Sequence, residues 1–168
     1  VLGNHNEALF LNTLNKNYEL IPIFPDYEFL VIDSNTQRIL SDTEFNKKKE
    51  LCLTAARKMK IKNLCVKSDI DENDIKLLSV DELNVSKHVI EENMRVVEAA
   101  KYLRKNKAKE FGKLMTESHV SLSQYYGVST DNLNKLVDLS NSFGALGSKL
   151  TGAGFGGAIV TLVKKELV

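Results

Sequence analysis

The sequence predicts an α+β domain, because strand-like runs lie at both ends of a block of amphipathic helices. Apolar, β-prone runs occupy residues 8–11, 18–23 and 29–33, and a last run, AIVTLV, spans 158–163. Between them, apolar residues recur at helical spacing. Strands that flank consecutive helices in this way are typical of an antiparallel sheet with helices packed on one face.

Composition is that of a globular protein of about one domain. The chain has 168 residues, 43% of them hydrophobic and 27% charged, close to average values. No apolar run approaches the ~18 residues that a membrane-spanning helix needs. The 23 basic and 22 acidic side chains nearly cancel, which argues against electrostatic binding of nucleic acid. Cys52 and Cys65 are too few for a disulfide scaffold, so we expect buried thiols and a cytoplasmic protein without membrane or nucleic-acid partners.

The first strands are marked by turns and prolines. The runs 8–11 and 18–23 predict a hairpin, and Pro22 with Pro25 predicts that regular pairing stops after it. FLVID at 29–33 is apolar enough to predict a central buried strand. Asp33 follows it in a cluster of turn-forming residues, which predicts an Asx turn.

Capping residues and periodicity predict four main helices, over residues 43–60, 87–104, 108–122 and 131–142. Ser41 with Glu44 forms a capping box for the first helix, and Ser79 with Glu82 forms a second box, interpreted as the start of a short turn. The acidic stretch 66–78 predicts a solvated connection with a short helix. The basic run Lys47–Lys49 is interpreted as a solvated helix face, and His119 as a hydrogen-bonded core residue rather than a proton-transfer group.

Glycine is concentrated near the end of the chain. Six of the nine glycines lie between residues 144 and 157, just before the last predicted strand. Such crowding weakens a fold unless the backbone needs positive φ or a close approach. Consecutive N–H groups in such a loop can bind an anion, whereas the alternative is a packing turn without a ligand. The spacing matches neither a Walker loop nor a Rossmann fingerprint.

Several segments together resemble one family. The stretch Gly147–Gly157, followed by an apolar strand, resembles the third signature of the GHMP small-molecule kinases, and its residue sequence is most similar to that of the galactokinase branch. Four further segments resemble that branch in the same order along the chain: Asp33–Asn35, Glu44–Cys52, Glu117–Ser129 and Asp131–Val137.

The resemblance implies an architecture and an activity. It implies that residues 26–168 are a GHMP kinase C-terminal domain, with a ferredoxin-like antiparallel sheet and cut at its end, and that residues 1–25 are a remnant of the N-terminal domain. It implies ATP-dependent phosphorylation of the anomeric hydroxyl of galactose, giving galactose 1-phosphate. The family's catalytic residues and most contacts to ATP and Mg²⁺ would precede Val1. We therefore expect this chain alone to be inactive and to hold neither catalytic nor metal-binding residues.

The resemblance also implies site residues. A nucleotide or phosphate loop would comprise Thr151, Gly152, Ala153, Gly154, Phe155, Gly156 and Gly157, and Asn35 and Phe45 would face the sugar. Galactokinases usually have tyrosine at the position of Phe45, whereas the N-acetylgalactosamine kinases have phenylalanine, so either sugar is compatible with the sequence. Alternatively, Phe45 is the first core residue of an amphipathic helix.

Two other functions remain open at this stage. Galactokinase-like chains can act as sugar sensors without turnover, and the distinction lies in an ATP loop that would precede Val1. An α+β module that serves only in protein interaction would bind neither sugar nor nucleotide.

Overall fold

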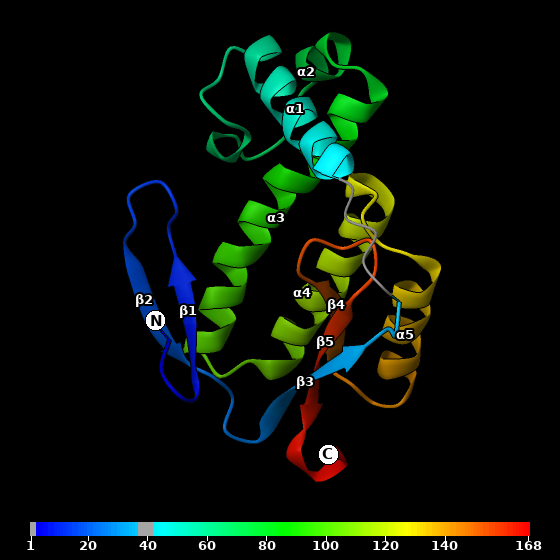
Figure 1. Cartoon of the computed structure of the whole chain (residues 1–168). Helices are drawn as coiled ribbons and strands as arrows, with labels where there is room; N and C mark the ends of the chain where they lie inside the picture. Colours follow the sequence, from blue (N-terminus) through cyan, green and yellow to red (C-terminus); the bar gives the residue numbers. More distant parts are fainter. Residues whose placement is uncertain (1–2, 37–41) are drawn as a thin grey trace.

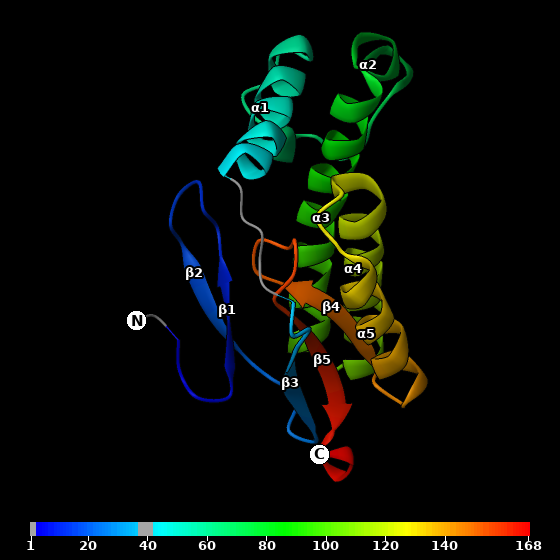
Figure 2. The same cartoon turned by 45° about the vertical axis from the view of Figure 1, so that its right-hand side comes forward.

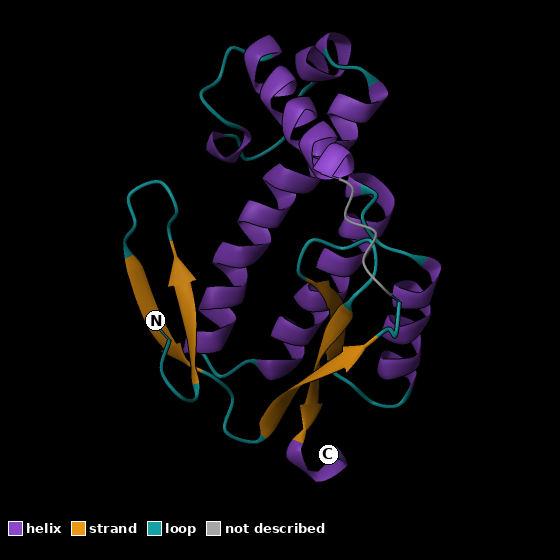
Figure 3. Ribbon diagram, in the orientation of Figure 1, coloured by secondary structure: helices purple, strands orange, loops and turns teal. Residues whose placement is uncertain are grey.

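The computed structural model describes residues 3–36 and 42–168, except for the side chains of Asp42, Thr43 and Phe45. Strands and helices follow one another as β1 (Glu7–Leu11), β2 (Tyr18–Pro22), β3 (Tyr27–Asp33), α1 (Asp42–Lys58), α2 (Glu72–Leu77), α3 (Val80–Arg104), α4 (Ala108–Ser121), α5 (Asp131–Ser142), β4 (Gly147–Thr151) and β5 (Ala158–Lys164) (Figure 1). The α+β class is confirmed (Figure 3). In this described part, no helix has the length and apolarity to cross a membrane.

Two sheets form, and both are antiparallel. β1 and β2 make the expected hairpin, whereas the second sheet has the order β3-β5-β4. β5 is central, as predicted for residues 158–163. The prediction that 29–33 is also central is wrong, because β3 lies at an edge and Val31 is 70% exposed. An apolar run alone does not distinguish a central strand from an edge strand, because an edge strand can also bury one face.

Helices α4 and α5 lie on the same side of the three-stranded sheet (Figure 2), which confirms for these two the prediction that all four helices pack on one face. For the helix predicted at 43–60 the prediction is wrong, because α1 packs against α3 instead. The backbones of α4 and β4 touch at Gly112 and Gly147, where a Cβ on either glycine would overlap the other segment. The Ser148 N–H donates to Thr116 Oγ1 of α4 at 3.4 Å. Helix α4 therefore covers the backbone of β4, a common way to protect an edge strand.

The hairpin packs against α3 rather than pairing with β3. Ile21 and Phe24 are buried in one cluster with Ala100 and Leu103 of α3 and with Leu162 of β5. The proposed division at residue 25 stays a prediction, but the hairpin does form a sheet of its own.

Helices α1, α2 and the first half of α3 form a helical lobe above the sheet (Figure 1). The Ser79–Glu82 capping box is confirmed, but it opens the 25-residue helix α3 rather than a short turn, so the helix predicted from 87 begins at Val80. Ser41 lies outside the described residues. Lys47 and Lys49 are exposed, and Lys47 pairs with Glu44 at 2.6 Å, as expected of a solvated face. Lys48 is half-buried, with its Nζ 5.8 Å from the centre of the Tyr126 ring, so the interpretation does not hold for it.

The two cysteines differ. Cys52 is half-buried in the core of the lobe, and burial raises the pKa of its thiol. Cys65 is exposed, so the expectation that it is buried is wrong. It lies in a short 3₁₀ turn, Leu64–Val66, where only Leu64 points into the core.

Candidate functional site

The glycine-rich loop connects β4 to β5 and has an unusual backbone. Gly152, Gly154, Gly156 and Gly157 have φ of 81°, 81°, 116° and 85°, and Phe155 between them has φ of 57°. Residues with side chains rarely adopt this region. The expectation that the loop needs positive φ is therefore confirmed.

The first anchor of this loop is Val128, in the connection between α4 and α5. The Phe155 N–H donates to the Val128 carbonyl oxygen at 2.7 Å. Gly154 lies so close that a Cβ there would be 2.8 Å from Val128 Cβ and would overlap the Val128 carbonyl. Val128 is held in turn by a π-helical turn, Leu122–Tyr126, because its own N–H donates to the Leu122 carbonyl at 3.1 Å.

The second anchor is the turn that ends β3. The Ser34 N–H donates to the Gly157 carbonyl at 2.7 Å, and the Gly157 N–H donates to the Thr36 carbonyl at 3.1 Å. Asn132 of α5 fixes the same turn, since its side-chain amide donates to Thr36 Oγ1 at 3.0 Å. The loop is thus attached to β3 and α5 as well as to its own strands.

Of the two residues expected at the sugar, Asn35 is exposed in this turn and so lies beside the loop. Asp33 accepts the Asn35 N–H at 2.9 Å, which confirms the Asx turn. The side chain of Phe45 lies outside the described residues, so its place at the sugar or in the core stays a prediction.

The start of the loop faces outward. Gly152 and Ala153 are exposed, and within the described part of the chain no residue accepts their N–H groups. Adjacent outward N–H groups on a fixed backbone can bind a phosphate oxygen. Binding of a nucleotide phosphate at this part of the loop stays a prediction.

Among residues 3–36 and 42–168, no group of three or more His, Cys, Asp or Glu side chains could hold a metal ion.

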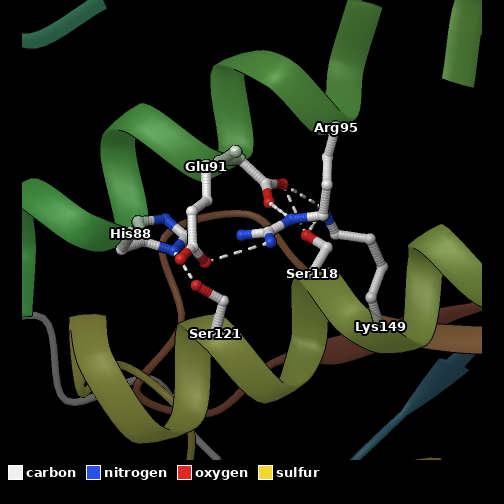
Figure 4. Close-up of polar contacts among 7 residues, drawn as sticks. His88, Glu91, Arg95, Ser118, Ser121 and Lys149 are labelled. Carbon is white, nitrogen blue, oxygen red and sulfur yellow. Dashed lines mark hydrogen bonds and ion pairs between the residues drawn. The ribbon is translucent and has the colours of Figure 1, made fainter. Parts of the chain in front are cut away.

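Beneath the loop, a cluster of charged side chains connects β4 to α3 and α4 (Figure 4). Lys149 Nζ lies 3.1 Å from Glu92 Oε1 and donates to Ser118 Oγ at 2.6 Å. Arg95 Nε donates to the other Glu92 oxygen at 2.8 Å, and Ser118 donates to Glu92 as well. Lys149, two residues before the loop, is thereby paired with side chains of α3 and α4.

The Glu92 carboxylate in this cluster stays ionised. Burial alone would raise the pKa of Glu92, but Lys149, Ser118 and Arg95 together lower it to about 2. Nearby, His88 Nδ1 is hydrogen-bonded to Ser121 Oγ at 2.9 Å. Burial lowers the pKa of His88 to about 4. At neutral pH the cluster therefore contains an ionised carboxylate and a neutral imidazole.

His119 is a buried core residue, in agreement with its interpretation from sequence. Its Nδ1 accepts the Leu150 N–H at 3.2 Å, and its Nε2 lies 3.1 Å from Asn134 Oδ1. Both ring nitrogens are thus occupied inside the protein, and burial lowers the pKa of the imidazole.

Sequence reasoning found the loop but missed the residues that hold it. Val128, Thr36 and Asn132 are far from the loop in sequence and contact it partly through backbone atoms. Backbone contacts leave no signal in residue types. Lys149 stands next to the glycines, but nothing in its position indicated Glu92 as its partner.

Residues 99–167 match the family described as GHMP kinases C terminal. Over these residues, which include the end of α3, helices α4 and α5 and strands β4 and β5, the chain matches the C-terminal domain of the GHMP kinases.

Its similarity to galactokinases extends over nearly its whole length. It is 33% identical to a galactokinase of Thermotoga maritima over 98% of this chain and 47% of that protein. It is 35% identical to one of Clostridium beijerinckii over 99% of this chain and 45% of that protein. The crystal structure of Lactococcus lactis galactokinase complexed with galactose superposes with a TM-score of 0.89 at 27% identity, covering 96% of this chain and 44% of that one.

A mevalonate kinase of L. major shares the fold, with a TM-score of 0.61 at 20% identity over 95% of this chain and 41% of that one. The chain spans about half the length of the curated relatives it matches.

Proposed function

We propose that this chain is the C-terminal half of an ATP-dependent sugar 1-kinase of the galactokinase type. The observation that carries the proposal is the similarity to galactokinases over 98% of the chain, together with a fixed, outward-facing glycine loop at the position of the family's third signature. The assignment of residues 1–25 to an N-terminal domain and of 26–168 to the C-terminal domain rests on the resemblance, since the hairpin forms a sheet of its own but shares a core with α3.

In the proposed reaction, the anomeric oxygen of galactose attacks the γ-phosphorus of ATP. The bond to the β–γ bridging oxygen breaks, ADP leaves, and galactose 1-phosphate forms. Phosphoryl transfer depends mainly on positioning and on stabilising phosphate charge. The Gly152 and Ala153 N–H groups would contribute to both at the phosphate pocket. The group that removes the hydroxyl proton, and the ligands of Mg²⁺, would belong to the N-terminal half.

On the sugar side, Asn35 and Phe45 would line the pocket. Phe45 has no hydroxyl, which favours N-acetylgalactosamine as an alternative substrate. A site that hydrogen-bonds a sugar hydroxyl discriminates less when that partner is absent. The cellular setting that we propose for this kinase is the cytoplasm.

The test uses the full-length protein that contains this chain, with magnesium–ATP and either galactose or N-acetylgalactosamine. Phosphorus NMR should detect a phosphate on the anomeric oxygen, and the ratio of kcat/KM for the two sugars identifies the substrate. Sugar binding without product would indicate a sensor. Absence of both binding and product would overturn the proposal and leave an interaction module.

A further inference from the structure

The backbone of β4 is fixed just before the glycine loop by one side chain from another element. The N–H of Leu150, two residues before Gly152, donates to Nδ1 of His119 at 3.2 Å. Leu150 and His119 are 2% and 4% exposed, so no water replaces this acceptor. An unmatched N–H at this depth is costly, and the position of Leu150 therefore depends on the ring.

This hydrogen bond needs one tautomer of a neutral imidazole. Nδ1 can accept only when the ring proton is on Nε2. Asn134 Oδ1 lies 3.1 Å from Nε2 and accepts that proton, and Ser129 Oγ donates to the same oxygen at 2.7 Å. With Oδ1 oriented in this way by α5 and its preceding residues, the ring has one arrangement that satisfies all its partners.

We propose that His119 is a positioning residue of the kinase: its neutral ring holds the Leu150 backbone and so sets where the glycine loop begins. The inference rests on the proposed function of that loop. His119 acts through Leu150 and needs no contact with substrate.

Protonation would break the arrangement, because Nδ1–H would then face the Leu150 N–H. Burial lowers the pKa of His119, while Asn134 and the Asp138 carboxylate on α5 raise it and Lys149 on β4 lowers it. On the α3 side, Glu92 is already bound to Lys149. Together these effects lower the pKa of His119, so the ring is neutral at pH 7. The loop should therefore loosen only in acid.

The test compares His119→Ala and His119→Asn in the full-length protein, with His88→Asn as the matched buried-histidine control. His88 hydrogen-bonds Ser121 and packs against the ring of Tyr126, with 4.6 Å between the ring centroids, and both partners lie outside the loop. His119→Ala should lower kcat about twofold to tenfold, the value of one neutral hydrogen bond. Asn can offer an acceptor near the place of Nδ1 and does not titrate, so it should restore most of kcat and remove the fall of kcat in acid. His88→Asn should lower the melting temperature but keep the wild-type dependence of kcat on pH.

Hydrogen exchange of residues 147–157, relative to intrinsic rates, gives a readout that does not depend on activity. Exchange should accelerate in acid in the wild type and in His88→Asn, but not in His119→Asn. Equal losses of melting temperature in all three variants, with unchanged pH profiles and exchange, would overturn the positioning role. If the protein phosphorylates no sugar but exchange behaves as expected, the proposed function fails while the link from His119 to the loop stands.

Discussion

Replacing Gly154 with alanine tests whether the loop depends on its contact with Val128. The residue has φ of 81°, and a Cβ there would be 2.8 Å from Val128 Cβ and would overlap the Val128 carbonyl oxygen. Positive φ costs an alanine about 1–2 kcal/mol. Overpacking adds about 1–3 kcal/mol, because Val128 is buried and held by the π-helical turn. We therefore expect a loss of about 2–5 kcal/mol of folding stability.

Gly144→Ala is the matched control for this experiment. Gly144 also has positive φ, 96°, but the atom nearest to its Cβ position, Leu167 Cδ1, is 3.7 Å away. The two variants share the φ cost and the change in unfolded-chain entropy, so their difference isolates the steric contact. Urea unfolding of the full-length proteins measures it, and kcat should fall in Gly154→Ala alone. Equal stabilities and equal kcat would refute the close approach as the reason for this glycine.

Four other predictions concern the sugar, the buried groups and the isolated chain. Phe45→Tyr in the full-length protein should favour galactose over N-acetylgalactosamine by no more than about tenfold in kcat/KM; an unchanged ratio would place Phe45 in the core. The pKa of His88 is about 4 in the folded protein and about 6.5 when unfolded, so the unfolded state binds the extra proton between these values. The contribution of neutral His88 to the free energy of unfolding is thus fully present above pH 6.5 and falls by up to about 3 kcal/mol as pH drops to 4. In His88→Asn, the free energy of urea unfolding should therefore depend less on pH over this range. Lys149→Met should cost about 2–3 kcal/mol, less than a fully buried pair, because the Lys149 and Glu92 side chains are 27% and 22% exposed; an unchanged urea midpoint would show that the cluster contributes nothing. Residues 1–168 alone should give no turnover in a coupled kinase assay, and measurable product would contradict the placement of the catalytic groups outside this chain.

The fold was predictable where local signals act. Thr130 caps α5 and Ser79 caps α3, and both caps are short-range effects that residue types reveal. The edge position of β3 was not predictable, because it depends on which strand pairs with it. β4 was also missed, since its sequence GSKLT has no alternating pattern and merges with the glycines that follow.

The candidate site, too, was predictable only where residue types carry the signal. Glycine density marked the loop, because positive φ at consecutive positions restricts the residue types that are tolerated. The partners that hold it, Val128 at one side and Thr36 at the other, are separated from it by long stretches of chain. Their contacts use main-chain atoms, which every residue possesses, so only the fold could show them.

The claim that this loop serves a phosphate is tested most directly by NMR of the full-length protein with a non-hydrolysable ATP analogue and magnesium. We predict that the amide resonances of Gly152 and Ala153 shift on binding, whereas that of Phe155, which donates to Val128 at 2.7 Å, shifts less. Nucleotide binding that leaves the Gly152 and Ala153 amides unmoved would contradict the account and make the loop a packing turn.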